Sequence, residues 1–207
     1  MNLFDMTGQV ALVTGGSRGL GREMALAFAA HGADVVIASR KLDACEATAR
    51  EIERLGRRAL PVECHVGQWD ALPALVDAAY ARFGRVDVLV NNAGIAPVAS
   101  SSADTSEALF DKILAVNLKG PFRLTALIAP RMVAAGGGCV INVTSTGAIR
   151  PTPDIGPYAA AKGALNILTR AHALEYGPTV RVNAIMAGPF WTDISAAWRE
   201  EIDATSD

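Results

Sequence analysis

Tyr158 and Lys162 are the first residues whose types and spacing suggest chemistry. They stand one turn apart at the start of a predicted helix, Tyr158–Glu175, so their side chains share a face. A free phenol, with a pKa of about 10, carries protons poorly at neutral pH, and a nearby ammonium lowers that pKa. General acid–base catalysis works best when the pKa approaches the working pH, so the pair is a candidate proton donor. Taken alone, the same pair is typical of two surface side chains.

Ser145 adds a hydroxyl group upstream of this pair. It lies just past the apolar run Cys139–Val143, a predicted buried strand. Ligand sites in open parallel sheets lie beyond the carboxyl ends of the strands, where a hydroxyl can donate to a carbonyl oxygen as charge develops. Thr144 and Thr146 have the same chemistry, and the residues alone leave the three hydroxyls open.

A glycine-rich turn occurs early in the chain, Thr14-Gly15-Gly16-Ser17-Arg18-Gly19-Leu20-Gly21. Glycine permits positive φ and a close approach of the backbone to a phosphate. The turn follows a predicted strand, Gln9–Thr14, and precedes a predicted helix, Gly19–His31, whose free N–H groups would face a pyrophosphate. Glycines alone indicate only a turn, but this position predicts a dinucleotide site.

The end of the second predicted strand, Asp34–Ala38, bears on which dinucleotide binds. An NAD site usually has an acidic residue there for the ribose 2′-hydroxyl, whereas this chain continues as Ser39-Arg40-Lys41. Arg18 in the glycine-rich turn can reach the same place. Two guanidinium groups suit a 2′-phosphate, so we expect NADP(H), although Arg40 and Lys41 are also ordinary charges for a helix start.

These residues are positioned by a regular alternation of apolar runs and helical patterns. The runs are near-continuous rather than alternating, which indicates a parallel sheet buried on both faces. Short connections between strands and helices predict right-handed crossovers and an α/β doubly wound sheet in three layers, αβα, the Rossmann fold with strand order 3-2-1-4-5-6. Beyond those already named, the predicted elements are Leu42–Leu55, Ala59–Cys64, Trp69–Phe83, Val86–Asn91, Ser106–Ala134 and Val180–Ile185.

The composition narrows the classes of protein to which this chain can belong. The 207 residues are 51% hydrophobic and 19% charged with a net charge of -2, which indicates one globular domain, 1–207, and argues against a nucleic-acid partner. No apolar run is long enough for a membrane span, and the first residues lack the pattern of a secretory signal. Cys45, Cys64 and Cys139 are far apart, which argues against disulfides and metal sites and for the cytoplasm.

The order and spacing of the motifs resemble the short-chain dehydrogenase/reductase family from Val10 to Thr192. The matching residues are Thr14-Gly15-x-x-x-Gly19-x-Gly21, Asn91-Asn92-Ala93-Gly94, Asn117, Ser145 and Tyr158-x-x-x-Lys162. The resemblance implies that Tyr158 is the general acid/base, that Lys162 tunes it and binds the nicotinamide ribose, and that Ser145 orients the carbonyl. It also implies that Asn117 supports a distortion of its helix and a water relay to the lysine.

The resemblance extends these assignments to two sets of binding residues. The cofactor set is Thr14, Gly15, Ser17, Arg18, Gly19, Leu20, Gly21, Ser39, Arg40, His65, Val66, Asn92, Ala93, Gly94, Tyr158, Lys162, Gly188, Phe190 and Thr192. The substrate set, which we expect to be mostly apolar, is Ile95, Ala96, Thr146, Gly147, Ile149, Ile155 and Trp191, with Arg150 as a candidate acid-binding group.

Three features depart from the family pattern. His65 stands where an aspartate often contacts adenine, and Ala187-Gly188-Pro189 replaces a Pro-Gly pair. The chain ends at Asp207, where the family usually continues through a helix and a seventh strand. Either the sequence is truncated, or the strand Val180–Ile185 is left as an open edge.

The resemblance implies an NADPH-dependent oxidoreductase that interconverts a carbonyl and a secondary alcohol. A 3-oxoacyl thioester reductase and a general ketone reductase both fit, and the alternative is a non-catalytic NADP-binding sensor or scaffold. We also expect a homodimer or homotetramer, because two helices carry more apolar and small residues than one sheet face needs. These are Ala159, Ala160, Ala164, Leu165, Leu168 and Ala171 in one helix and Phe110, Leu114, Leu118, Phe122 and Leu127 in the other.

Overall fold

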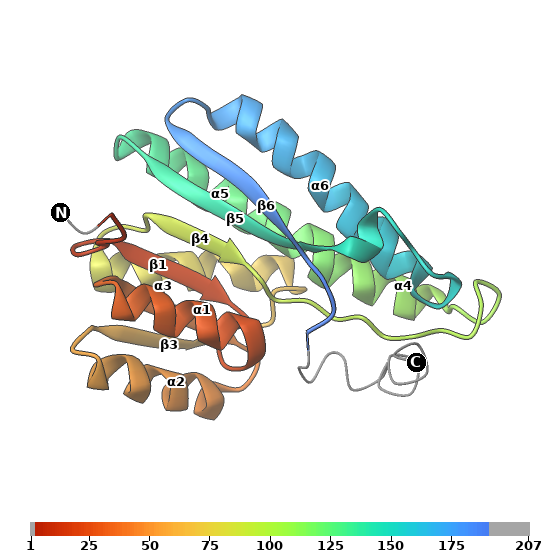
Figure 1. Cartoon of the computed structure of the whole chain (residues 1–207), viewed down its shortest axis with the longest axis horizontal. Helices are drawn as coiled ribbons and strands as arrows, with labels where there is room; N and C mark the ends of the chain where they lie inside the picture. The colour runs from red at the N-terminus through yellow and green to blue at the C-terminus, as the bar shows by residue number, and fades with distance from the viewer. Residues whose placement is uncertain (1–2, 191–207) are drawn as a thin grey trace.

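The computed structural model describes residues 3–190. Its centre is a six-stranded parallel sheet in the order β3-β2-β1-β4-β5-β6, as predicted. All strand arrows point the same way, and the long loops lie at their tips (Figure 1). The strands are β1 (Val10–Thr14), β2 (Asp34–Ser39), β3 (Ala59–Glu63), β4 (Val88–Asn91), β5 (Gly138–Ser145) and β6 (Val180–Ala187).

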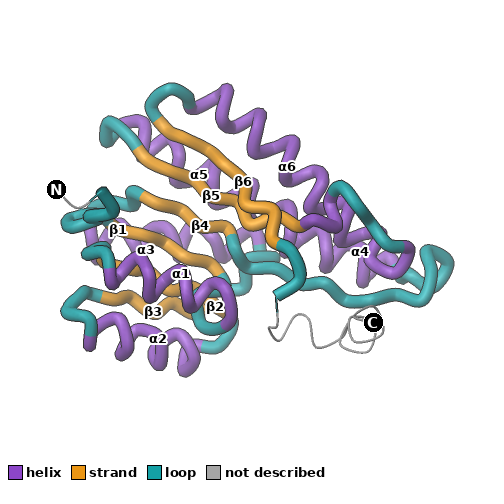
Figure 2. The backbone as a smooth tube through the Cα atoms, in the orientation of Figure 1, coloured by secondary structure: helices purple, strands orange, loops and turns teal. Residues whose placement is uncertain are grey.

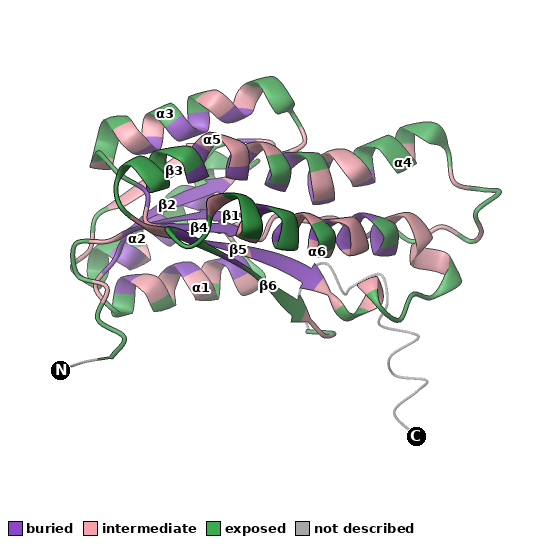
Figure 3. Cartoon of the chain, turned by 90° about the horizontal axis from the view of Figure 1, so that it is seen from above, coloured by how far each residue is buried: buried purple, intermediate pink, exposed green. Residues whose placement is uncertain are grey.

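Helices cover both faces of the sheet and complete the three predicted layers (Figures 2 and 3). One buried cluster joins the sheet to α1 and α2, and a second joins its other face to α3 and α5. The central strands touch a core on each face, which explains why they read as continuous apolar runs. The helices are α1 (Gly19–Ala30), α2 (Leu42–Arg54), α3 (Leu72–Phe83), α4 (Glu107–Leu114), α5 (Gly120–Ala134) and α6 (Gly156–Tyr176).

The predicted helix Ser106–Ala134 is interrupted in its middle. A π-helical turn, Ala115–Lys119, separates α4 from α5 and holds Asn117. The Asn117 side chain donates to the carbonyl of Ile113, 3.1 Å away, in competition with the helical ladder. Pro121, at the start of α5, has no N–H to continue that ladder. These two features account for the distortion.

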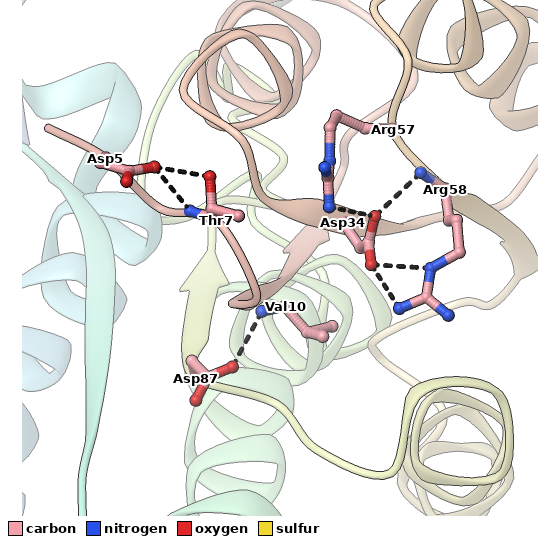
Figure 4. A network of polar contacts seen from close by, with 7 residues as sticks. All are labelled: Asp5, Thr7, Val10, Asp34, Arg57, Arg58 and Asp87. Atoms are coloured by element: carbon pink, nitrogen blue, oxygen red, sulfur yellow. Dashed lines mark hydrogen bonds and ion pairs between the residues drawn. The ribbon is translucent and has the colours of Figure 1, made fainter.

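The rim opposite the strand tips is held by charged side chains (Figure 4). Asp34 is 2% exposed and accepts hydrogen bonds from Arg57, at 3.0 Å, and from the backbone and side chain of Arg58. Burial alone would raise the pKa of Asp34, but these bonds and charges outweigh it and hold the pKa below its usual value. A second carboxylate, Asp87, accepts from the backbone N–H of Val10.

The outer part of β6 is exposed. Ile185 and Met186 keep 50% and 47% of their surface accessible, while Val180 and Val182 are buried. Within residues 3–190, β6 is therefore an edge strand, as predicted. No helix in this range has the length and apolarity that crossing a bilayer requires.

Candidate active site

A cleft of about 990 Å³ lies beyond the carboxyl ends of the strands. One part, the glycine-loop end, is lined by the glycine-rich turn and the ends of β2 and β3. The other part, the tyrosine end, is lined by Ser145, Gly147, Ile155 and Tyr158. Its place at the strand tips is where ligands bind in doubly wound sheets.

The glycine-rich turn is shaped by close contact with the end of β4. Gly15 has φ of +64°, and a Cβ there would lie 2.9 Å from the side-chain nitrogen of Asn92. Asn92 donates to the carbonyl of Thr14 at 2.9 Å, and the Thr14 hydroxyl accepts from the backbone of Asn92 and Ala93. A side chain larger than that of glycine at position 15 would disrupt this packing. Because the turn carries no such side chain, the start of α1 stays open to the cleft.

The start of α1 is suited to an anion. Its first turn contains no acidic residue, and the residue before it, Arg18, makes no side-chain cap. The orphan N–H groups and the positive end of the helix dipole therefore favour a bound phosphate. The Ser17 hydroxyl donates to that of Ser39 at 2.9 Å, which ties the turn to the end of β2.

Positive charge gathers beside this turn. Arg18, Arg40 and Lys41 are exposed and line the glycine-loop end. Among the residues that the structure describes, the cleft lining contains one carboxylate, Asp154, and none at the end of β2. The arrangement has the donors that a ribose 2′-phosphate would need.

His65 lines the same part of the cleft in a fixed orientation. Its Nδ1 lies 3.1 Å from the backbone N–H of Gly67, which donates to it. The proton of a neutral His65 is then on Nε2, so the ring can donate a hydrogen bond, whereas an aspartate could only accept one.

Ser145 and Tyr158 meet at the tyrosine end. The Ser145 Oγ accepts from the backbone N–H of Gly147 at 3.1 Å, which leaves its own proton available. Burial raises the pKa of Tyr158, and a hydrogen bond with Ser145 acts in the opposite direction. The rival hydroxyl of Thr144 instead lies 3.5 Å from the carbonyl of Ile185 on β6.

Lys162 is buried beneath this pair. It is 3% exposed, and its Nζ donates to the carbonyl of Val143 at 2.7 Å. Burial lowers the pKa of Lys162 to about 8, and its Nζ is 5.9 Å from the centre of the Tyr158 ring. The expected lowering of the tyrosine pKa is not found, because burial of the phenol dominates.

Asn117 connects the π-helical turn to the segment after β4. Its side chain donates to the carbonyl of Ile95 at 2.8 Å and accepts from the Ile95 N–H at 3.2 Å. A Cβ on Gly94 would lie 3.0 Å from the Asn117 oxygen and 3.6 Å from the Lys162 Nζ. Gly94 therefore leaves room between these polar atoms that a side chain would fill.

Most residues assigned from the sequence to the cofactor or the substrate do line the cleft. At the glycine-loop end and along its floor these are Gly15, Ser17, Arg18, Gly19, Leu20, Gly21, Ser39, Arg40, His65, Val66, Asn92, Ala93, Gly94, Gly188 and Phe190. Around the tyrosine they are Ile95, Ser145, Thr146, Gly147, Ile155, Tyr158 and Lys162.

Four assigned residues do not line it. Thr14 and Asn117 are buried behind the lining and act through backbone contacts. Ala96 packs in a small core with Ile113 and Tyr158, because its methyl group faces the helices. Ile149 is 63% exposed, since it lies in a loop beyond the cleft. Trp191 and Thr192 lie outside the described residues.

The lining of the cleft exposes more apolar than polar surface, and it also includes polar residues outside the substrate set. These are Lys112, Arg150, Thr152 and Asp154. Arg150 was a weak candidate in the sequence, but nothing in the pattern of Lys112 separated it from other helix-surface lysines. Its place depends on how α4 packs against α6, which spacing along the chain does not reveal.

Comparisons with known proteins agree with this geometry. The sequence profile of the short chain dehydrogenase family matches residues 9–203. Dehydrogenase/reductase SDR family member 4 of Sus scrofa is 38% identical over 188 residues, which are 90% of this chain and 67% of the relative.

Two solved structures carry nicotinamide cofactors. A protein from Beutenbergia cavernae with bound NADP is 33% identical with a TM-score of 0.90, over 97% of this chain and 80% of the other. The 3-ketoacyl-(acyl-carrier-protein) reductase of Brucella melitensis, complexed with NADH, is 35% identical with a TM-score of 0.85, over 92% and 79%. The chain described above therefore belongs to the short-chain dehydrogenase family of oxidoreductases.

Proposed function

We propose that this protein interconverts a carbonyl and a secondary alcohol by hydride transfer with NADP(H), on one cytoplasmic domain that assembles as a homo-oligomer. The observation that carries the proposal is that Ser145 and Tyr158 line the same cleft as an open helix N-terminus. One end of the cleft suits a dinucleotide phosphate, and the other presents a proton donor. A protein that only binds the dinucleotide would not need a proton donor at the tyrosine end.

The cofactor would be held by groups of known chemistry. The N–H groups at the start of α1 would bind the pyrophosphate, and Arg18 and Arg40 the 2′-phosphate. A bound reduced nicotinamide supplies the hydride. Because similar structures carry either NADP or NADH, the preference for NADP(H) is proposed on this chain's own charges.

The protein's part in the reaction is to orient the carbonyl and to move a proton. The Ser145 hydroxyl donates to the carbonyl oxygen, where negative charge develops, and Tyr158 delivers its proton to that oxygen. Lys162 places a positive charge behind the phenol, which favours the phenolate that remains. Asn117 holds the carbonyl of Ile95 in place, where a water relay toward Lys162 would begin.

Replacement of Tyr158 by phenylalanine tests the proposal. The variant removes the proton donor while keeping the ring, so we expect kcat to fall at least about 100-fold, the usual contribution of general acid–base catalysis. The oxidation of NADPH, followed by its absorbance with a panel of ketones and 3-oxoacyl thioesters, measures turnover. NADPH affinity, measured by calorimetry, should change much less than kcat.

Two outcomes would contradict the proposal. Turnover that persists in Tyr158→Phe would assign the proton to another group. Tight NADPH binding by the wild-type protein without turnover of any carbonyl would favour a non-catalytic sensor or scaffold.

A further inference from the structure

Two cations that line the cleft are not used by the mechanism above. Lys112 and Arg150 both line the cleft. Neither forms an ion pair with any residue between 3 and 190, although several other arginines in this range are paired with carboxylates. Charged side chains that line a cleft without a partner are candidates for contact with a charged ligand.

Arg150 lies on the side of Tyr158, and Lys112 belongs to α4, a helix that packs against α6. Lys112 precedes Ile113 in α4, and Ile113 packs against Tyr158 and Ala161 of α6 in a small core. The Arg150 backbone donates to the carbonyl of Thr146 at 3.0 Å, directly after Ser145. Figure 1 shows α4 and the loop between β5 and α6 at the same end of the molecule.

The loops that carry these residues are joined to each other. The backbone N–H of Ala99 donates to the carbonyl of Asp154 at 3.1 Å, which links the segment before α4 to the segment before α6. Ile155 then packs beside Tyr158. Arg150 and Asp154 therefore belong to a wall of the tyrosine end.

The described lining of the cleft carries more positive than negative side chains. Arg18, Arg40 and Lys41 lie at the glycine-loop end, where the phosphates would bind, which leaves Lys112 and Arg150 against a single carboxylate, Asp154. The whole chain carries a net charge of -2, so this local excess of positive charge is opposite to the average. A cleft lined by one sign of charge concentrates ligands of the other sign.

We propose that the substrate carries an anionic group besides its carbonyl, with a carboxylate as the simplest case, and that Lys112 and Arg150 bind it. This inference rests on the proposed function and names its substrate class. Arg150 offers a planar fork for a carboxylate, and Lys112 adds a point charge to the same cleft. The carbonyl then lies between this anion site and the Ser145–Tyr158 pair.

The test uses matched acids and esters. The probes are 4-oxopentanoate, 5-oxohexanoate and 6-oxoheptanoate with their methyl esters, which keep the ketone and remove the charge. In the wild-type protein kcat/KM with NADPH should be about tenfold higher for the preferred acid than for its ester, as one charge-assisted contact allows. Equal use of acid and ester would overturn the inference.

Charge variants then assign the preference to residues. Arg150→Gln and Lys112→Gln should each lower kcat/KM for the acid about tenfold and leave the ester unchanged. Asp154→Asn should raise kcat/KM for the acid, and a loss of structure would not produce such an increase. Arg50→Gln, an exposed substitution on α2 outside the cleft, is the control. An equal loss for acid and ester, or a weaker affinity for NADPH, would contradict an anion site for substrate.

A binding measurement separates this inference from the proposed function. Calorimetry of the protein saturated with NADP⁺ reports the affinity for each acid and ester without turnover. Tighter binding of the acid, lost in Arg150→Gln, would support the anion site even if no carbonyl were reduced. Turnover that depends on Tyr158 but shows no preference for the acid would support the proposed function and refute the anion site.

Discussion

Arg40 stands exposed at the end of β2, where it lines the glycine-loop end of the cleft. If it binds the 2′-phosphate, Arg40→Ala should raise the dissociation constant for NADPH about tenfold and leave that for NADH nearly unchanged. Calorimetry with both cofactors measures the two constants. An equal change for both would place Arg40 away from the 2′-phosphate, and Arg50→Gln should change neither.

Lys162 gives the ligand-free protein a distinct pH dependence. Burial lowers the pKa of Lys162 from 10.5 to about 8, so the folded protein releases this proton between those values while the unfolded chain keeps it. Its contribution to the free energy of unfolding therefore rises with pH across that window, by up to about 1.4 kcal/mol per pH unit, and the cost of the buried ammonium is greatest below pH 8.

Lys162→Met removes this titration. Urea denaturation at pH 7.5 and 9.5 should show that the wild-type protein gains stability relative to the variant as the pH rises, on the order of 1–2 kcal/mol. A difference between the two proteins that stays constant with pH would mean that the lysine titrates alike in both states.

Single residues show where sequence reasoning succeeds and where it stops. Motif spacing identified Ser145, Tyr158 and Lys162, and the structure brings all three to one cleft. It gave the wrong direction for the pKa of Tyr158, because burial, which raises that pKa, is a property of the packed molecule. Nor did it separate Ala96, which faces the core, from Ile95, since neighbours in an irregular loop follow no fixed period.

Among the elements, the junction of α4 and α5 is the most sensitive to a single change. Asn117→Leu keeps the volume but leaves the N–H and carbonyl of Ile95 without their partner in a part-buried place. We expect the free energy of unfolding to fall by about 2 kcal/mol, measured by urea denaturation. Asn183→Leu, at an exposed position of β6, should change it little. Similar stability of both variants would show that the π-helical turn does not depend on this side chain.

The sequence predicted the regular strands and helices more completely than the irregular segments within them. The apolar runs placed all six strands and their order, because buried parallel strands have a strong signature. The π-helical turn has no such signature in the apolar pattern, and its expectation came from the family resemblance to Asn117. The boundaries of β5 and α6 extend past the predicted ones, to Ser145 and Gly156, because Thr144 and Ser145 continue the strand and Pro157 fits the first turn of the helix.

The outer face of α6 bears on how whole molecules associate. Ile167 and Leu174, two turns apart, are 61% and 86% exposed, and Phe110 and Phe122 on the neighbouring helices are 41% and 37% exposed. We expect this apolar face to pair with a second copy. Light scattering should then give at least twice the chain mass for the wild-type protein and the chain mass for Ile167→Glu. A monomeric wild-type protein would refute the pairing, and Arg50→Gln should not alter the mass.

The two rims of the sheet have different roles, because one holds the strands together and the other carries the reactive cleft. β2 runs from Asp34 to Ser39, so the ion pair of Asp34 with Arg58 and the reactive cleft are separated by about 17 Å of continuous strand. Loops at one rim can therefore exchange residues such as Arg150 or Asp154 for others while the opposite rim keeps the strands in register. New substrates become accessible in small steps, each leaving the scaffold's resistance to heat nearly unchanged.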